Sequence, residues 1–375
     1  MTDLRAWCDE AWTFLRGHWP EIAGTLSAAW QAHRERRNVV ACLIGPYDSG
    51  KSTLLKRLPL DHDLPIPEWL TISGRRETFE VQEASVAGLV FRDTPGLRSN
   101  KAEHDERALA AILFCDVPLI VLPPQLVTGD RDVIVGLANG SRFACPPNVA
   151  YAPNSLILVL SRMDEAGPSP QDDPEEYQEL LTRKISELRR LMQANGVPDG
   201  IWTVFAVAAD PFAQVGNRAN ATRTDFDAYR GWDGVASLTA ALNTLGSRRD
   251  PLRLHAELRL LAFQLRLLAE ACEREAAERR QSAETAANEA RVYEAARRRL
   301  QAVLDAARAD LDRRVEEVIA FAKRRLEVRE QTDLSDFLRR ELEKEAVRWS
   351  RRFDDEVANF LQEIEAEQEK RRERP

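Results

Sequence analysis

The sequence predicts an α/β fold, in which a mainly parallel sheet is flanked by an N-terminal helical segment and a C-terminal bundle of long helices. Short β-rich runs alternate with helical stretches in the middle of the chain, and large apolar residues recur at helical spacing near the start. After Gly246 there is no glycine, and after Pro251 no proline until the last residue. We therefore divide the chain into residues 1–37, 38–247 and 248–375.

The N-terminal segment carries four widely spaced tryptophans. Apolar residues follow one another at spacings of three to five, which predicts one or two helices, and Pro20 predicts a break or a kink between them. The tryptophans are Trp7, Trp12, Trp19 and Trp30. Because such large rings need a partner surface, we expect this segment to pack with the C-terminal bundle.

The central segment reads as βαβ units around a parallel sheet. Its strand-like runs are residues 39–44, 89–91, 119–122, 156–160 and 204–207. Helical patterns lie between them, which is the arrangement that covers both faces of a parallel sheet.

The C-terminal third has dense charge and apolar seams at helical period, over residues 258–268, 300–319 and 338–364. Such seams predict a bundle. One helix over residues 251–330 would be ~120 Å long at about 1.5 Å per residue. The polar, alanine-rich stretch 281–288 is an alternative turn, so one helix and a hairpin both stay open. Residues 332–335 predict a turn and a new helix start.

Composition excludes several classes of protein. The net charge of −8 provides no global positive field, so nucleic acid is an unlikely partner. Five scattered cysteines without a CxxC pair disfavour a disulfide framework and a zinc site, and they favour a reducing cytosol. We find no secretory signal and no apolar run near the roughly 20 residues that span a bilayer. We therefore expect a cytoplasmic protein whose membrane contact, if any, is peripheral.

A phosphate-binding motif lies between the first predicted strand and the next helix. Residues 45–53, Gly-Pro-Tyr-Asp-Ser-Gly-Lys-Ser-Thr, fit the pattern GxxxxGK[ST]. Such a loop turns backbone N–H groups toward an anion, Lys51 neutralises the β- and γ-phosphates, and the Ser52 hydroxyl ligates Mg²⁺. The residues that we expect to contact nucleotide are Gly45, Tyr47, Asp48, Ser49, Gly50, Lys51, Ser52 and Thr53.

A second motif, Asp-Thr-Pro-Gly at residues 93–96, follows the strand-like run 89–91. At the carboxyl end of a strand, Asp93 would hold Mg²⁺ through water. The N–H of Gly96 can sense the γ-phosphate because no Cβ obstructs the approach. Between the two motifs we expect a switch threonine that ligates Mg²⁺ only while the γ-phosphate is present. Thr78 is our choice, with Thr71 as the alternative.

A third motif, Ser-Arg-Met-Asp at residues 161–164, ends another predicted strand. The carboxylate of Asp164 can accept both the N1–H and the N2–H of guanine, a pair that adenine does not offer. Arg162 can stack on the face of a purine. Ala208 lies in the next strand-to-loop segment, which we expect on the base side. An aspartate that only caps a turn is the alternative for Asp164, and it would favour an ATPase.

In this order the motifs resemble the translation-factor-like class of P-loop GTPases, and the helices on both sides of the domain resemble its dynamin-like branch. The resemblance implies that Mg²⁺, GTP and GDP bind, that GTP is hydrolysed, and that homo-dimers or oligomers form through the GTPase domain and the helices. It also implies that pairing of GTPase domains moves a helical stalk. Tyr47 stands where dynamins usually carry glutamine. Leu97 stands where small Ras-like GTPases carry a water-positioning glutamine.

Catalytic help must then come from elsewhere in the chain. Potassium-activated GTPases of this class usually carry asparagine at the position of Asp48, so an Asp48 oxygen could hold K⁺ near the bridging phosphate oxygen. The expected catalytic residues are Lys51, Thr78, Gly96 and Asp48, and the expected Mg²⁺ ligands are Ser52, Thr78 and Asp93.

Three functions are open from the sequence. The first is a GTPase that moves a helical stalk on a membrane, a filament or a protein partner. The second is a nucleotide-dependent binding switch or scaffold with incidental turnover. The third is a P-loop ATPase.

Overall fold

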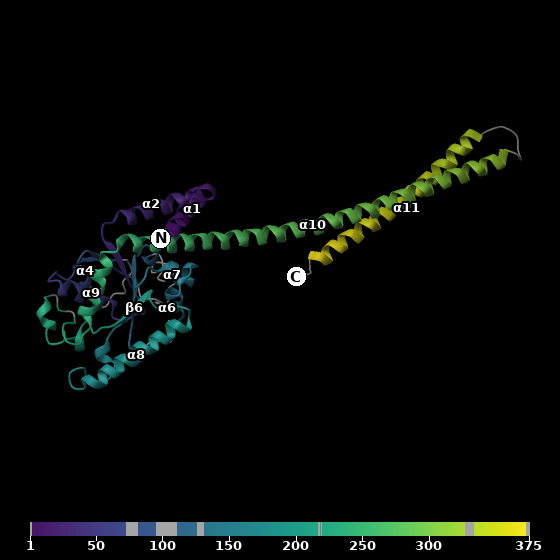
Figure 1. Cartoon of the computed structure of the whole chain (residues 1–375). Coiled ribbons are helices and arrows are strands. Elements are labelled where there is room, and N and C mark those ends of the chain that lie inside the picture. The colour runs from purple at the N-terminus through teal and green to yellow at the C-terminus, as the bar shows by residue number, and fades with distance from the viewer. Residues whose placement is uncertain are drawn as a thin grey trace. The chain divides into compact units, whose positions relative to one another are not determined.

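The computed structural model describes residues 2–72, 82–94, 111–125, 131–216, 218, 220–326 and 334–372. The chain forms two compact units, Met1–Glu270 and Ala271–Pro375 (Figure 1). The first unit contains the sheet, and the described residues of the second unit form helices.

The sheet has six strands in the order β2-β3-β1-β4-β5-β6. The strands are β1 (Val39–Ile44), β2 (Gln82–Val86), β3 (Leu89–Asp93), β4 (Val117–Leu122), β5 (Leu156–Leu160) and β6 (Trp202–Ala206). All neighbours pair in parallel except β2, which is antiparallel to β3. The predicted fold class is therefore confirmed. The edge strand β2 has no counterpart in the prediction, because only its alternate residues Ala84 and Val86 are buried.

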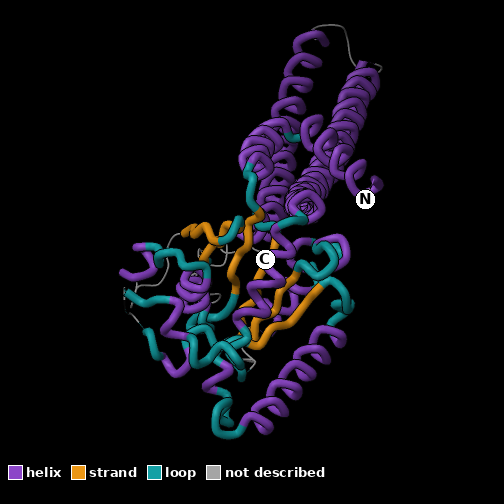
Figure 2. The backbone as a smooth tube through the Cα atoms, turned by 60° about the vertical axis from the view of Figure 1, so that its left-hand side comes forward, coloured by secondary structure: helices purple, strands orange, loops and turns teal. Residues whose placement is uncertain are grey.

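Helices cover both faces of the sheet (Figure 2). One face of β1, lined by Ala41 and Leu43, packs with α3 and α9, and the opposite face, lined by Cys42 and Ile44, packs with α6 and α8. The helices of this layer structure are α3 (Lys51–Asp61), α4 (Glu68–Ile72), α6 (Arg131–Ala138), α7 (Pro147–Ala150), α8 (Pro174–Ala194) and α9 (Val235–Gly246).

The N-terminal segment forms α1 (Thr2–His18) and α2 (Pro20–Glu35), which break at the predicted proline. Trp12 and Leu15 of α1 belong to the same buried cluster as Leu258 and Leu261 of α10 (Arg249–Leu326). Helix α10 has 78 residues and runs without interruption through residues 281–288, where a turn was the alternative.

The first turns of α10 are buried on all sides, since every residue from 252 to 261 is buried. Charged residues are included, and each has a partner in the surrounding elements. Glu257 accepts hydrogen bonds from Arg5 at 2.6 Å and from the indole of Trp12 at 2.9 Å. Arg259 donates to the carbonyl oxygens of Ala150 and Cys115. A helix buried all round needs such partners, because an unpaired buried charge is strongly destabilising.

Asp116, just before β4, joins α10 to the sheet and to α2. Its carboxylate accepts two hydrogen bonds from Arg253, at 2.6 and 3.0 Å, one from the backbone N–H of Val40 at 2.8 Å and one from Nε2 of His33 at 3.1 Å. Burial alone would raise the pKa of Asp116. The hydrogen bonds and charges of His33 and Arg253 instead lower this pKa to about 2.

In the second unit, α11 (Leu334–Arg372) lies antiparallel to α10. Trp349 donates to the carbonyl of Ala307 at 3.0 Å. Side-chain contacts at Phe321–Phe337, Arg314–Glu345 and Arg299–Glu363 continue the pairing along the hairpin. The apolar seams over residues 300–319 and 338–364 thus face each other. Helix α11 begins at Leu334, within the predicted turn and helix start at residues 332–335.

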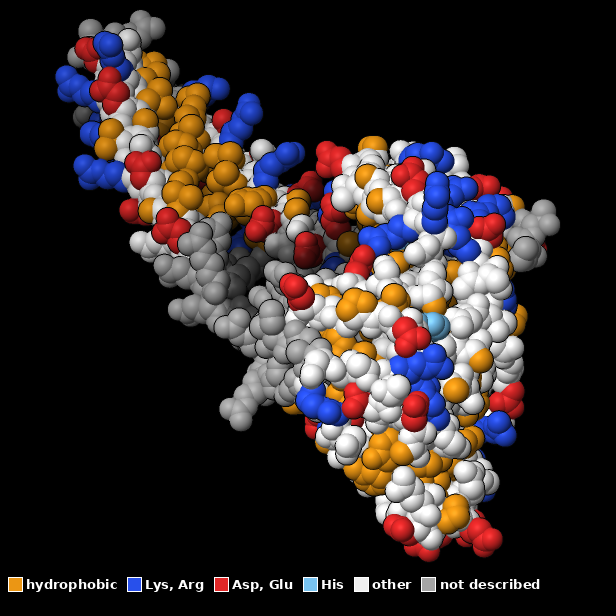
Figure 3. Space-filling model, turned by 90° about the vertical axis from the view of Figure 1, so that its left-hand side faces the viewer, with side chains coloured by type: hydrophobic (Ala, Val, Ile, Leu, Met, Phe, Trp, Pro, Cys, Tyr) orange, Lys and Arg blue, Asp and Glu red, His pale blue; other side chains and the backbone are white. Residues whose placement is uncertain are grey.

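The hairpin leaves apolar side chains at its surface, and Figure 3 shows them gathered along one side. Among the large apolar residues of the hairpin whose burial the structure describes, only Phe360 is buried, whereas Leu304, Ile319, Phe321, Val347 and Leu361 are exposed. Two helices therefore do not cover both seams. No helix in the described part of the chain is long and apolar enough to cross a membrane.

The burial of His33 predicts a pH dependence of stability. Desolvation lowers the pKa of His33, the hydrogen bond and charge of Asp116 oppose this shift in part, and the charges of Arg253 and Arg92 lower the pKa further. The unfolded histidine, with a pKa near 6.5, then binds more protons than the folded one. Stability should therefore be fully present above pH 6.5 and fall as the pH drops below it, with a slope of up to about 1.4 kcal/mol per pH unit.

We expect His33→Gln, which keeps a donor for Asp116, to flatten this slope in urea unfolding between pH 7 and 5. Part of the slope should remain in this variant, because burial also lowers the pKa of His255. Substitution of the exposed His18 by glutamine is the control. Equal slopes for wild type and His33→Gln would contradict the assignment.

Candidate functional site

The loop 45–53 lies at the carboxyl end of β1 and leads into α3, which begins at Lys51. The Lys51 side chain is buried, and Nζ donates to the carbonyl oxygens of Gly45 at 3.0 Å and of Pro46 at 2.7 Å. These bonds hold the ammonium group within the loop, beside the positive end of the α3 dipole. The arrangement suits an anion such as a phosphate chain.

Two glycines of the loop are required by its geometry. A Cβ on Gly45 would lie 2.2 Å from the carbonyl oxygen of Val121 in β4. Gly50 has φ of +85° at the N-cap of α3, in the left-handed region that favours glycine. The pattern GxxxxG therefore reflects close packing against β4 and a backbone turn.

Ser52 and Asp93 lie within hydrogen-bonding distance at the side of the loop where Mg²⁺ is expected. The Ser52 hydroxyl donates to the Asp93 carboxylate at 3.3 Å, and Asp93 is buried at the end of β3. The next residue, Thr94, is tied to β1 through a 2.7 Å hydrogen bond to the carbonyl of Leu43. A hydroxyl and a carboxylate fit Mg²⁺, which takes oxygen ligands and keeps waters and substrate phosphates in its shell. Within the described ranges no three His, Cys, Asp or Glu side chains form a metal cluster.

The motif at residues 161–164 touches the phosphate loop. The Ser161 hydroxyl lies 2.6 Å from the carbonyl oxygen of Ser49 and 3.0 Å from that of Leu122, so it ties the loop to β4 and β5. Asp164 is buried, and its carboxylate accepts the N–H of Phe212 at 2.8 Å. This bond orients the carboxylate, which retains further lone pairs for a ligand.

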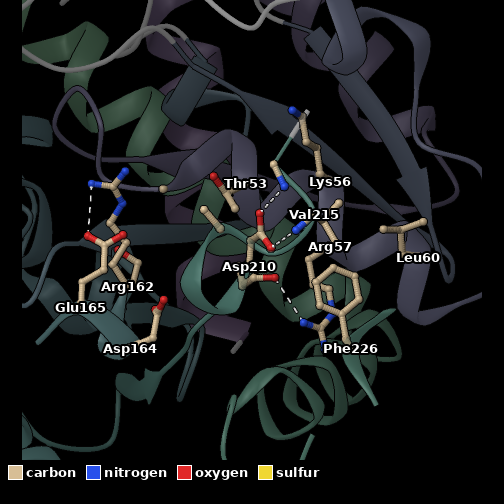
Figure 4. A pocket seen from close by; sticks show the side chains of 15 residues that line it. Thr53, Lys56, Arg57, Leu60, Arg162, Asp164, Glu165, Asp210, Val215 and Phe226 are labelled. Atoms are coloured by element: carbon tan, nitrogen blue, oxygen red, sulfur yellow. Dashed lines mark hydrogen bonds and ion pairs between the residues drawn. The ribbon is translucent and has the colours of Figure 1, made fainter. Parts of the chain in front are cut away.

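A cavity of about 210 Å³ brings the two motifs together (Figure 4). Gly50 and Thr53 line it from the phosphate loop, and Arg162 and Asp164 from the loop after β5. Its other lining residues are Lys56, Arg57, Leu60, Ser161, Glu165, Ala209, Asp210, Ala213, Val215, Gly216 and Phe226.

Arg57 and Asp233 hold the loop after β6 in place. The buried Arg57 guanidinium donates to Asp233 at 2.5 Å and to the carbonyl of Ala209 at 3.2 Å. The N–H of Ala208 donates to the Asp233 carbonyl at 2.9 Å. Ala209, rather than the predicted Ala208, therefore lines the cavity, because Ala208 is buried against this support.

Several residues of the cavity were not predicted. The Asp210 carboxylate accepts the N–H groups of Val215 and Gly216, at 2.9 and 2.7 Å, and thereby closes the loop after β6. Lys56 lies across from it, and burial lowers the pKa of this lysine. Polar residues after a predicted strand were the available signal, but their spacing matches no motif.

The described part of the structure does not bring every predicted residue to the cavity. Thr78, Gly96 and Leu97 lie outside the described residues, and Thr71 lies in α4. The side chain of Tyr47 is 69% exposed and does not line the cavity.

Asp48 faces Arg162 rather than the interior of the loop. Its two carboxylate oxygens accept hydrogen bonds from the guanidinium at 3.0 and 3.1 Å. A K⁺ ion at the same carboxylate would be repelled by the charge of Arg162. The K⁺ site at Asp48 stays a prediction, and Arg162 is the partner that competes with it.

No family model matches the sequence, and no curated protein is significantly similar to it. Among solved structures, the chain is similar to LeoA, a bacterial dynamin GTPase from ETEC, at 15% identity and a TM-score of 0.44, over 97% of this chain and 69% of that one. It is also similar to an oligomerised bacterial dynamin pair described as sensing and tethering membranes, at 14% identity and a TM-score of 0.40, over 98% and 62% of the two chains.

A third similar structure is a dimerization-deficient mutant of Toc33 from Arabidopsis thaliana, at 13% identity and a TM-score of 0.37, over 65% of this chain and 94% of that one. The structures that this chain resembles are thus bacterial dynamins and other P-loop GTPases. The chain spans less than two thirds of the dynamin pair protein.

The packing of Gly45 predicts the effect of a single methyl group. Gly45→Ala should lower the free energy of unfolding by about 1–3 kcal/mol, because the added Cβ would overlap the carbonyl of Val121. Gly24→Ala in α2 is the matched control, since nothing lies within 4 Å of its Cβ and alanine favours a helix. Chemical unfolding measures both variants. Equal stability of the two would contradict the assignment.

Proposed function

We propose that this chain is a Mg²⁺-dependent GTPase, in which the loop 45–53 binds the phosphates and Asp164 recognises guanine. The observation that supports the proposal most is the shared cavity, because residues of the phosphate loop and Asp164 line it together. The distance between them is set by Ser161, whose hydroxyl contacts the phosphate loop directly.

The proposed chemistry is attack of water on the γ-phosphorus, with cleavage of its bond to the β–γ bridging oxygen and release of GDP and phosphate. Lys51 and the N-terminus of α3 neutralise the charge that develops on the phosphate oxygens. Ser52 and Asp93 would hold Mg²⁺, which would supply positive charge to the phosphate oxygens. Thr78 as a further Mg²⁺ ligand and Gly96 as the γ-phosphate sensor are proposed from the sequence motifs.

Preference for guanine is assigned to the Asp164 carboxylate. Two acceptor oxygens match the N1–H and N2–H donors of guanine, whereas adenine presents no such pair of donors. The hydrogen bond from Phe212 supports this role, because a pre-oriented carboxylate loses less conformational freedom on binding.

The preference is tested by Asp164→Asn, which should weaken GTP binding roughly tenfold to a hundredfold. Binding of xanthosine triphosphate should improve, since its C2 oxygen accepts from an amide. Competition of GTP, xanthosine triphosphate and ATP against a fluorescent GDP gives the affinities. Asp172→Asn, on an exposed turn of the same connection, is the control. Equal affinity of the wild type for ATP and GTP would support the ATPase alternative instead.

We further propose that nucleotide state reaches α10 through residues 114–116. Arg92, next to Asp93, donates to the carbonyl of Phe114 at 2.7 Å. From α10, Arg259 donates to the carbonyl of Cys115, and Arg253 pairs with Asp116. Three arginines thus contact three successive residues. A shift of β3 at its Asp93 end would therefore move the attachment points of α10.

We also propose that the chain assembles through its C-terminal helices. The uncovered apolar side of the α10–α11 hairpin supports a homo-dimer or oligomer, because two helices alone leave this surface in water. A peripheral membrane or a protein partner at a cytoplasmic location would cover the same side chains. A nucleotide-dependent switch or scaffold is favoured over a stalk-moving GTPase if assembly leaves turnover unchanged.

The extent of the first unit predicts which truncations fold. Residues 1–270 should bind GTP, because both N-terminal helices and the buried turns of α10 are included. Deletion of residues 1–30 should expose Leu258 and Leu261 and cause aggregation. Residues 38–247, which lack both seams of this contact, should still bind GTP but lose assembly-stimulated hydrolysis. Light scattering and circular dichroism measure the outcome. A soluble, fully active protein lacking residues 1–30 would refute this arrangement.

A further inference from the structure

Asp48 and Arg162 form a two-bond ion pair between loops that are 114 residues apart in sequence. The Nη1–Oδ2 distance is 3.1 Å and the Nη2–Oδ1 distance is 3.0 Å. Because both groups are planar, two parallel bonds fix the orientation of the guanidinium as well as its position.

The backbone at both ends of the pair is unusual. Asp48 has φ of 60° and Arg162 has φ of 54°, in the left-handed region that few non-glycine residues adopt. The Arg162 stem passes the end of the phosphate loop, since a Cβ on Gly50 would lie 3.9 Å from its Cγ. Arg162 lines the cavity and Asp48 does not, so Asp48 holds the guanidinium from outside.

Arg162 has a second acidic neighbour, so two carboxylates compete for its guanidinium. Glu165 lies 3.8 Å from Nη1, and Figure 4 shows both side chains beside Asp164 at the cavity. Without Asp48, the guanidinium would be drawn toward Glu165 and away from the phosphate loop.

We propose that Asp48 is a positioning residue, which holds the Arg162 guanidinium as a preformed platform for the guanine and ribose of the bound nucleotide. This inference rests on the proposed GTPase function. A guanidinium plane can stack on a purine, and a platform that is set before binding lowers the ordering cost. The same pair leaves the Asp48 carboxylate occupied, so Asp48 acts through Arg162 and not as a cation ligand.

The pair itself is too exposed to matter much for stability. The side chains of Arg162 and Asp48 are 37% and 67% exposed, and exposed ion pairs contribute little to folding. A substitution should therefore change nucleotide binding and leave the unfolding temperature unchanged. A merely structural role would do the reverse.

The test is a double-mutant cycle with Asp48→Ala, Arg162→Ala and the combined variant in the full-length protein with Mg²⁺. Each single variant should release a fluorescent GDP roughly fivefold to tenfold faster, and the combined variant should be no faster than Arg162→Ala. Asp48→Glu should restore most of the loss. The affinity for tripolyphosphate, which has no base or ribose, should be the same for all variants once displacement is corrected for the affinity of each variant for the fluorescent GDP.

The exposed pair Asp63–Arg223 provides a matched control. Its aspartate also has a positive φ, of 55°, its atoms are 3.3 Å apart, and neither residue lines the cavity. Asp63→Ala should leave GDP release unchanged.

Other outcomes would overturn the proposal. Additive effects of the two substitutions, or none, would show that the pair does not position the platform. An effect of Asp48→Ala in K⁺ but not in Na⁺, with Arg162→Ala harmless, would assign Asp48 to a cation instead. If the wild type binds tripolyphosphate but not GDP, the proposed function itself fails, and the role of the pair fails with it.

Discussion

The buried ion pair between Arg253 and Asp116 is the contact on which the first unit depends. Both side chains are almost fully buried, so the pair is tolerable only because its remaining hydrogen-bonding groups are satisfied. Asp116 also receives Val40 and His33, and Arg253 also donates to the carbonyls of residues 33, 34, 36 and 38. One network therefore positions α2, β1, β4 and α10 together. Loss of either partner would leave an uncompensated charge in the interior, which is strongly destabilising.

The same two strands carry this network at one end and the phosphate loop at the other. Val40 and Asp116 lie at the amino ends of β1 and β4, which pair in parallel from Ala41↔Val117 to Ile44↔Ile120. At the carboxyl ends, Gly45 lies directly against Val121. A pair of fully buried strands is stiff because every backbone group is bonded and every side chain is packed. Helix α10 and the candidate nucleotide site are therefore attached to opposite ends of one rigid element.

The base side of the cavity is built from loops whose polar groups are already satisfied. Ser161 donates to, and Asp164 accepts from, backbone groups of another segment, and Asp210 accepts from N–H groups of its own loop. Phe212, which braces Asp164, has φ of 55°, a costly conformation for an aromatic residue. Strain of this kind persists where the surroundings define the position of the chain, and here it orients a carboxylate toward the cavity.

The sequence by itself determined the features that follow from local pattern: the parallel strands, the glycines and lysine of the phosphate loop, the break at Pro20, and the strand-end positions of Asp93 and Asp164. Neighbouring residues largely determine burial, backbone conformation and strand direction, so these features could be predicted. Only the tertiary structure decided that Asp116 pairs with Arg253 and Asp48 with Arg162, that Ala209 lines the cavity, and that β2 closes the sheet edge. The two residues of such an ion pair are up to 137 residues apart in the sequence. The strength of an ion pair depends on the distance between its charges in space, and the spacing of residues along the chain does not predict that distance.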